Sequence, residues 1–148
     1  MTPSTTCEIL TWNELTKSEL YEVMCLRDLV FVVGQKITAV PELDGLDDQC
    51  AHVLLRDADG TLVGTARIFH QQTPRVVGRV AVHTDHQRKG LGSQLMLQLQ
   101  EWMGPEPAEL HAQAHLEEWY ASLGWRRVGE VFEEAEIPHV TMVWGVAE

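Results

Sequence analysis

Basic residues, cysteines and long apolar runs are all scarce in this chain of 148 residues, and each scarcity excludes a class of protein. Lysine and arginine number 11 against 22 aspartates and glutamates, and the net charge of −11 argues against general nucleic-acid binding, which needs a basic face. Cys7, Cys25 and Cys50 are too few and too far apart for a zinc site or a disulfide framework, so we expect no metal and a reducing, cytoplasmic environment. No stretch is apolar for long enough to cross a membrane, and residues 1–10 lack the basic start of a signal peptide. We therefore expect one cytoplasmic domain, residues 1–148, without a membrane or nucleic-acid partner.

The order of apolar patterns predicts an α+β fold, with a mixed, mostly antiparallel sheet of six to seven strands flanked by helices. Thr16 and Glu19 have the spacing of a capping box at the head of the first helix, for which Gly34 is a natural stop. Pro138 is expected in the turn before the last strand. The expected strands are 7–12, 51–56, 61–70, 76–82, 109–113, 125–132 and 139–146, and the expected helices are 16–33, 91–103 and 116–123.

Residues 76–94, VVGRVAVHTDHQRKGLGSQ, combine an apolar strand, a glycine-bearing loop and the start of a helix. This arrangement points unpaired backbone N–H groups at an anion. Gly90 and Gly92 would let the main chain approach a phosphate without a Cβ between them, and Arg88 and Lys89 add positive charge. The pattern predicts a cradle for a pyrophosphate-bearing cofactor, and a plain strand-to-helix turn is the structural alternative.

Two motifs in this chain resemble those of the GCN5-related N-acetyltransferase (GNAT) superfamily. Gln87, Gly90 and Gly92 match the superfamily signature Q/R-x-x-G-x-G/A. A later segment resembles the form Asn, seven residues, Tyr, x-x-x-Gly-Phe, with Gln113 in the Asn position and Tyr120 in the Tyr position. An aromatic residue before a helix-ending glycine is by itself typical of packing, so the separation of the two motifs carries the resemblance.

Three further segments, residues 31–35, 113–115 and 136–139, resemble the ElaA-like branch of the superfamily. One position departs from that branch: Gly34 stands where a glutamate is usual, so a carboxylate expected near the acceptor pocket is missing.

The resemblance implies that acetyl-CoA is the co-substrate and that the sheet splays between its fourth and fifth strands. The pyrophosphate would bind the loop, and the pantetheine arm would lie along the fourth strand, where Gly78 indicates an irregularity. A backbone N–H near Val82 would polarise the thioester oxygen. The implied cofactor contacts are Val80, Ala81, Val82, Gln87, Arg88, Lys89, Gly90, Leu91, Gly92, Ser93, Gln113 and Tyr120.

The expected reaction is direct attack of a primary amine on the thioester within a ternary complex. Tyr120 is the expected general acid by family position, because a phenol is protonated at neutral pH. His139 is the first candidate for the general base and His52 the second, and deprotonation through water is a third route.

Several alternatives stay open at this level. The chain could be a non-catalytic acyl-CoA-binding sensor or interaction module on the same fold, or a domain that binds another phosphate compound such as a nucleotide. The acceptor could be a small-molecule amine, a peptide N-terminus or a protein lysine, and the protein could be a monomer or a homodimer. The acids of residues 42–48 and 133–136 are typical of solvated loops, although they could also attract a cationic substrate.

Overall fold

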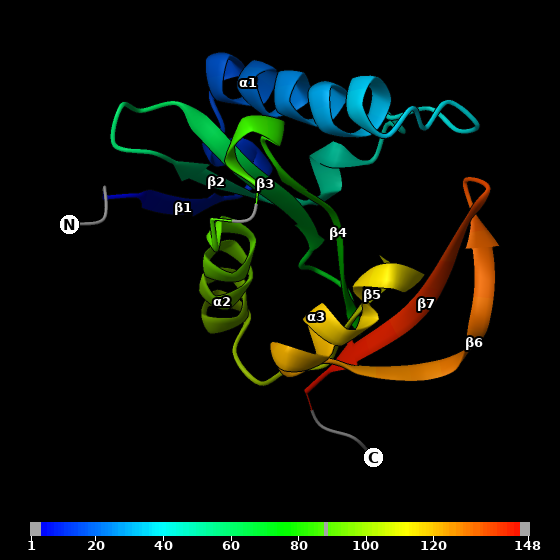
Figure 1. The fold of residues 1–148 in the computed structure, drawn as a ribbon. Helices are drawn as coiled ribbons and strands as arrows, with labels where there is room; N and C mark the ends of the chain where they lie inside the picture. The colour runs from blue at the N-terminus through cyan, green and yellow to red at the C-terminus, as the bar shows by residue number, and fades with distance from the viewer. Residues whose placement is uncertain (1–3, 88, 146–148) are drawn as a thin grey trace.

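The computed structural model describes residues 4–87 and 89–145, and in this part of the chain seven strands form one sheet (Figure 1). The strand order is β1-β2-β3-β4-β5-β7-β6, with every neighbouring pair antiparallel except β4 and β5, which are parallel. This confirms the predicted mixed, mostly antiparallel sheet. The strands are β1 Thr6–Leu10, β2 Ala51–Arg56, β3 Leu62–Phe69, β4 Arg75–Val82, β5 Ala108–Gln113, β6 Arg126–Glu134 and β7 Ile137–Trp144.

Helices cover both faces of the sheet. Helix α1, Lys17–Arg27, lies over one face, and α2, Leu91–Met103, and α3, Glu117–Ser122, lie over the other (Figure 1). The sheet therefore has a hydrophobic core on each face. Successive side chains of a strand point to opposite faces, so Val53 of β2 packs with α2 and its neighbour Leu54 packs with α1. None of the helices in residues 4–87 and 89–145 combines the length and hydropathy needed to cross a membrane.

The first helix begins as its sequence predicts but continues differently. Glu19 N donates to Thr16 Oγ1 over 3.1 Å and Thr16 N donates to Glu19 Oε1 over 2.8 Å, so the predicted capping box is present. After Arg27 the chain widens into a π-helical segment, Asp28–Gly34, in which Gln35 N donates to Val30 O five residues earlier. The prediction of one α-helix to Val33 was therefore wrong in its second half.

Two predicted boundaries in the strands need correction. Pro138 lies inside β7 opposite Glu133, and the turn is formed instead by Ala135 and Glu136, whose φ angles are 53° and 65°. Positive φ at both residues of a two-residue loop matches the right-handed twist of the strands, which makes this a tight hairpin. At the other end, Trp12 begins a short 3-10 turn rather than ending β1. The predicted end of the last strand, residue 146, lies outside the described residues.

We expect Gly124→Ala to lower the free energy of unfolding by about 1–3 kcal/mol. Gly124 has a φ of +108°, and a Cβ there would lie 2.8 Å from Cζ3 of Trp144, so the variant gains both backbone strain and a clash. Denaturant unfolding measures the loss. Gly60→Ala is the matched control, because Gly60 has a φ of +85° but open space around its Cα, and it should lose only the strain. An equal loss in the two variants would contradict the clash with Trp144.

Candidate active site

A cleft opens where β4 separates from β5. The two strands pair only from Arg75 to Val77 on β4, so the edge of β4 beyond Val77 has no strand partner on that side among the described residues. The register between β3 and β4 shifts by one residue directly after Gly78, and Arg79 takes a φ of +53°. This bulge bends β4 away from β5. The splay between these strands and the irregularity at Gly78 are therefore both present.

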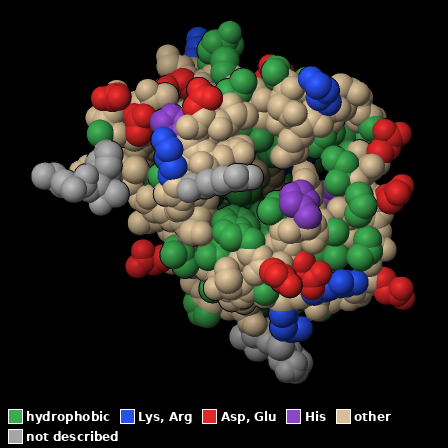
Figure 2. All heavy atoms as spheres, viewed as in Figure 1, with side chains coloured by type: hydrophobic (Ala, Val, Ile, Leu, Met, Phe, Trp, Pro, Cys, Tyr) green, Lys and Arg blue, Asp and Glu red, His purple; other side chains and the backbone are tan. Residues whose placement is uncertain are grey.

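The cleft has a volume of about 320 Å³ and contains four of the residues predicted from the sequence. Val80, Gln113, Tyr120 and His139 all line it, although they come from four different elements. A hollow with hydrophobic side chains inside it lies at the middle of the face in Figure 2. Among the described residues no group of three or more His, Cys, Asp and Glu side chains is arranged to hold a metal ion.

Tyr120 enters the cleft from α3 and is almost fully buried, with 5% of its surface exposed. Burial raises the pKa of its hydroxyl above the ordinary value, because the phenolate loses its hydration. The ring packs edge-on against Trp119, with 4.7 Å between centroids, and Gly124 ends the short helix behind it. Tyr120 is thus held in the protonated form at neutral pH, which is the form that can donate a proton.

His139 lies on β7 with one ring nitrogen occupied and the other open. Its Nδ1 lies 2.7 Å from the carbonyl oxygen of Ile137. A carbonyl only accepts, so Nδ1 carries the hydrogen and Nε2 of the neutral ring keeps its lone pair. The imidazole also stacks on Phe132, with 6.2 Å between ring centroids, so its orientation is fixed.

His52 does not line the cleft and lies on β2, between β1 and β3. It is completely buried on β2, between its strand partners Leu10 and Arg67, and its Nε2 lies 2.9 Å from the carbonyl oxygen of Asp47. Burial lowers the pKa of His52, because desolvation disfavours the imidazolium. A substrate in the cleft does not contact this side chain, whose local role is to hold the chain near Asp47.

The loop for which a phosphate cradle was predicted leads into the head of α2. Gly90 precedes the helix with a φ of +77°, and the first intrahelical bond runs from Gln94 N to Gly90 O over 3.1 Å, so the earlier N–H groups of the helix are left for a ligand. A Cβ on Gly92 would lie 3.2 Å from Trp119, which gives this glycine a packing role as well. Arg88, also predicted here, lies outside the described residues.

Side-chain amides connect the two sides of the site. Gln113 Nε2 at the end of β5 donates to Gln35 Oε1 over 3.0 Å, and both residues line the cleft. Gln87 Nε2 donates to the Val82 carbonyl over 3.1 Å and so links the loop to β4. Ala81 and Val82 belong to the part of β4 that pairs with β3 but not with β5, next to the lining residue Val80.

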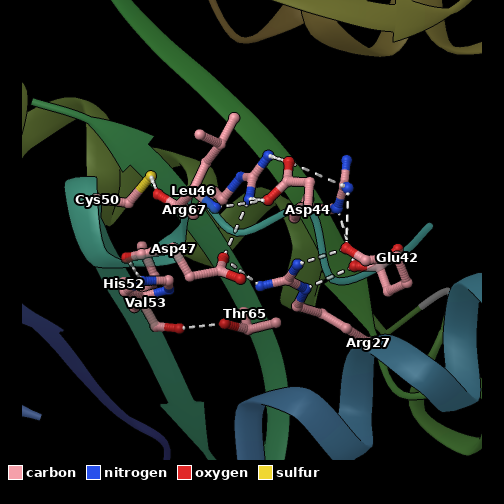
Figure 3. Close-up of polar contacts among 11 residues, drawn as sticks. Arg27, Glu42, Asp44, Leu46, Asp47, Cys50, His52, Val53, Thr65 and Arg67 are labelled. Carbon is pink, nitrogen blue, oxygen red and sulfur yellow. Dashed lines mark hydrogen bonds and ion pairs between the residues drawn. The ribbon is translucent and has the colours of Figure 1, made fainter. Parts of the chain in front are cut away.

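The acidic run before β2 is largely exposed, as predicted for a solvated loop, but three of its acids are bound by arginines. Arg27, only 1% exposed, binds Glu42 through Nε over 2.7 Å and Asp47 through Nη1 over 2.6 Å (Figure 3). Arg67 donates a hydrogen bond from each of its Nη atoms to the Asp44 carboxylate, over 3.0 and 2.6 Å. The sequence has no local signal for these pairs, because each arginine lies on an element distant from the loop.

These ion pairs also position residues at the cleft. Arg79, the residue at the bulge, donates from Nε to Glu42 Oε2 over 2.8 Å, and Arg79, Glu42 and Arg67 all line the cleft. The hydrogen bond from Arg67 holds the pKa of Asp44 well below its usual range. Burial opposes the same effect at Asp47, but Arg27 and Arg67 outweigh it and lower that pKa as well.

Comparison with known proteins shows which family this sequence matches. The family model described as "Acetyltransferase (GNAT) domain" matches residues 36–146. Protein ElaA of Escherichia coli K12 is 39% identical over 140 residues, which cover 88% of this chain and 90% of that protein. A UPF0039 protein of Schizosaccharomyces pombe is 39% identical over 137 residues, covering 88% and 91%.

Several solved structures are similar to this one over nearly the whole chain. The crystal structure of E. coli ElaA superposes with a TM-score of 0.85 at 36% identity and covers 95% of this chain and 99% of that one. An acyl-CoA N-acyltransferase from Pseudomonas aeruginosa has a TM-score of 0.83 at 37% identity, covering 96% and 100%. An aminoglycoside 6'-N-acetyltransferase complexed with coenzyme A has the same fold, with a TM-score of 0.68 at 15% identity over 93% and 95% of the two chains.

We expect Asp44→Asn to lower the free energy of unfolding at pH 7 by about 1–3 kcal/mol, because it leaves Arg67 without its forked partner. The folded-state pKa of Asp44 is depressed, so its contribution is complete above the unfolded value of about 3.9 and is lost as the pH falls below it. The difference between wild type and variant should therefore shrink below about pH 4. Denaturant unfolding at several pH values measures it. Asp48→Asn, which changes an exposed carboxylate on the same loop, is the control.

Proposed function

The chain belongs to the GNAT acetyltransferase family, and from this premise we propose that it transfers the acetyl group of acetyl-CoA to a primary amine. The attack is direct and takes place in a ternary complex. The observation that carries the proposal is the pairing of two groups in one cleft: the protonated hydroxyl of Tyr120 and the open Nε2 of His139. They come from different elements, α3 and β7, and line the same cleft as Val80, which lies on the part of β4 that does not pair with β5.

The described residues offer what coenzyme A requires. The free N–H groups at the head of α2, from Leu91 to Ser93, would bind the pyrophosphate, with Lys89 beside them. The edge of β4 from Val80 to Val82 would hydrogen-bond the pantetheine arm, because β5 does not occupy it. When bound, acetyl-CoA supplies an activated acyl group as a thioester.

The chemistry of the chain's own groups is proton transfer and positioning. An ammonium cannot attack, so His139 Nε2 takes one proton and leaves a neutral amine. The amine nitrogen forms the new C–N bond, the C–S bond breaks, and the sulfur takes a proton from the Tyr120 hydroxyl, which solvent restores. The nitrogen loses a second proton to solvent as the amide forms, which balances the proton that solvent returns to Tyr120. Holding the amine and the thioester together in the cleft removes much of the entropic barrier.

Gly34 is the observation that favours a second candidate, a non-catalytic acyl-CoA sensor. A glutamate is usual at this position in similar chains, but Gly34 is not among the residues that line the cleft, and a Cβ there would lie 3.1 Å from the Leu29 carbonyl. The carboxylates that do line the cleft are Glu42 and Glu134. A thiol-release screen with acetyl-CoA against amines, aminoglycosides, polyamines and peptides separates the candidates, because a sensor releases no thiol with any of them.

Acetyl-CoA should raise the melting temperature. A ligand at 100 times its Kd adds about 2.7 kcal/mol to the stability of the folded state, which corresponds to a rise in Tm of about 5–10 °C. Thermal unfolding with and without acetyl-CoA measures the shift. ATP is the comparison ligand, since it shares a phosphate group but not the pantetheine arm. A rise with ATP and none with acetyl-CoA would instead indicate a nucleotide-binding domain.

Tyr120→Phe should lower kcat by about 10²–10⁴-fold while the Kd for acetyl-CoA stays within about twofold. The variant keeps the buried ring and loses only the hydroxyl that donates to sulfur. Steady-state thiol release and calorimetric titration measure the two quantities. Tyr21→Phe is the matched control, because Tyr21 is 72% exposed on α1. An unchanged rate in Tyr120→Phe would remove Tyr120 as the acid.

A further inference from the structure

One carboxylate in the cleft differs from all the other charged groups there. Glu42 is held by Arg27 and Arg79, and Arg67 is held by acids of the loop. Glu134, on β6, has no lysine or arginine within 4.0 Å among residues 4–87 and 89–145. Its charge is therefore not balanced by a permanent cation.

The neighbours of Glu134 are two histidines from the adjoining strands. His111 Nδ1, on β5, lies 2.7 Å from Glu134 Oε1, and because a carboxylate only accepts, His111 donates this bond. His139 Nε2, on β7, lies 3.9 Å from Glu134 Oε2, which is too far for a hydrogen bond. All three side chains line the cleft.

The gap between His139 and Glu134 separates two acceptors. The Nδ1 hydrogen of His139 is committed to the Ile137 carbonyl, so Nε2 of the neutral ring presents a lone pair, and Glu134 Oε2 presents another. A donor nitrogen at an ordinary distance of about 2.9 Å from each atom fits between them. A primary ammonium, with three N–H groups and a positive charge, is the donor that satisfies both.

We propose that the acceptor's ammonium group binds between His139 Nε2 and Glu134 Oε2, an inference that rests on the proposed acetyl transfer. Glu134 attracts the cation and hydrogen-bonds to it. One proton then passes from the ammonium nitrogen to His139 Nε2, and the resulting imidazolium stays beside the Glu134 carboxylate. The neutral amine then turns about its C–N bond, so that the freed lone pair leaves His139 and meets the thioester carbon. His111 is a positioning residue that fixes the Glu134 carboxylate.

The remainder of the cleft defines the class of amine. The walls on the α1 side are apolar and are formed by Phe31, Ile37, Val40 and Phe69. The other charged groups lining the cleft already have partners, so a second cation on the substrate would gain no counter-ion and would lie near arginines. The site therefore suits a primary amine with one positive charge carried on an apolar group, rather than a polyamine.

Removing the charge of Glu134 should weaken amine binding. Of the two carboxylates that line the cleft with His139, Glu42 is bound by Arg27 and Arg79, whereas the described partners of Glu134 are histidines. In Glu134→Gln the KM for 2-phenylethylamine should rise about tenfold, because the ammonium loses its counter-ion.

The experiment uses the full chain, acetyl-CoA and 2-phenylethylamine as the probe amine, with Glu133→Gln as the matched control. Glu133 is the exposed neighbour of Glu134 on β6 and does not line the cleft, so its variant should behave as wild type. Spermidine is the comparison amine, and its kcat/KM should be lower than that of the probe. Calorimetric titration of the probe into protein saturated with coenzyme A measures binding without turnover.

The outcomes separate this inference from the proposed function. Equal KM and Kd in wild type and Glu134→Gln, with normal thiol release, would overturn the ammonium site and leave the acetyl transfer standing. Probe binding that weakens about tenfold in Glu134→Gln, with no thiol release from wild type, would keep the site and overturn the transfer. Failure of wild type to bind the probe, or a preference for spermidine, would overturn the assigned class of amine.

Discussion

The separation of β4 from β5 after Val77 is the constraint on which the rest of this structure depends. The bulge at Arg79 inserts one extra residue into β4 and turns the strand away from β5. Beyond that point β4 still pairs with β3, but among the described residues its other edge has no strand partner. Buried backbone groups need partners, and an open strand edge inside a cleft is therefore a place for an extended ligand. Tyr120 and His139 both line the cleft that opens there.

The arginine–carboxylate pairs hold the loop against this cleft. Arg27 is almost entirely buried, and a buried guanidinium without carboxylates would cost several kcal/mol, so the loop before β2 must supply Glu42 and Asp47. Arg79 joins the bulge to the same Glu42. The loop before β2 is thus bound to the strand that bends. These charges cancel one another. Glu134 is therefore the carboxylate in the cleft whose negative charge is not balanced by a lysine or arginine among the described residues.

Much of the cofactor side could be predicted because its signals are local. Glycine spacing and apolar periodicity indicated both the loop at Gly90 and the helix that follows, and that helix has the predicted bounds Leu91–Met103. The acceptor side could be predicted only in part. His139, the first candidate for the base, lines the cleft, whereas His52, the second candidate, is buried on β2 away from it. Glu134 was unremarkable within a run of acids, because its importance depends on histidines from two other strands.

The sequence by itself determined the order of strands and helices, the caps and most turns, because these depend on interactions over a few residues. It also determined the family, through two motifs with a characteristic separation. Only the tertiary structure decided which acids are neutralised and which histidines reach the cleft. The reason is that the deciding ion pairs join residues 15 to 37 positions apart, so their partners meet only after the sheet has formed. Local patterns specify which side chains are available, and the fold specifies which of them remain without a partner to act on a substrate.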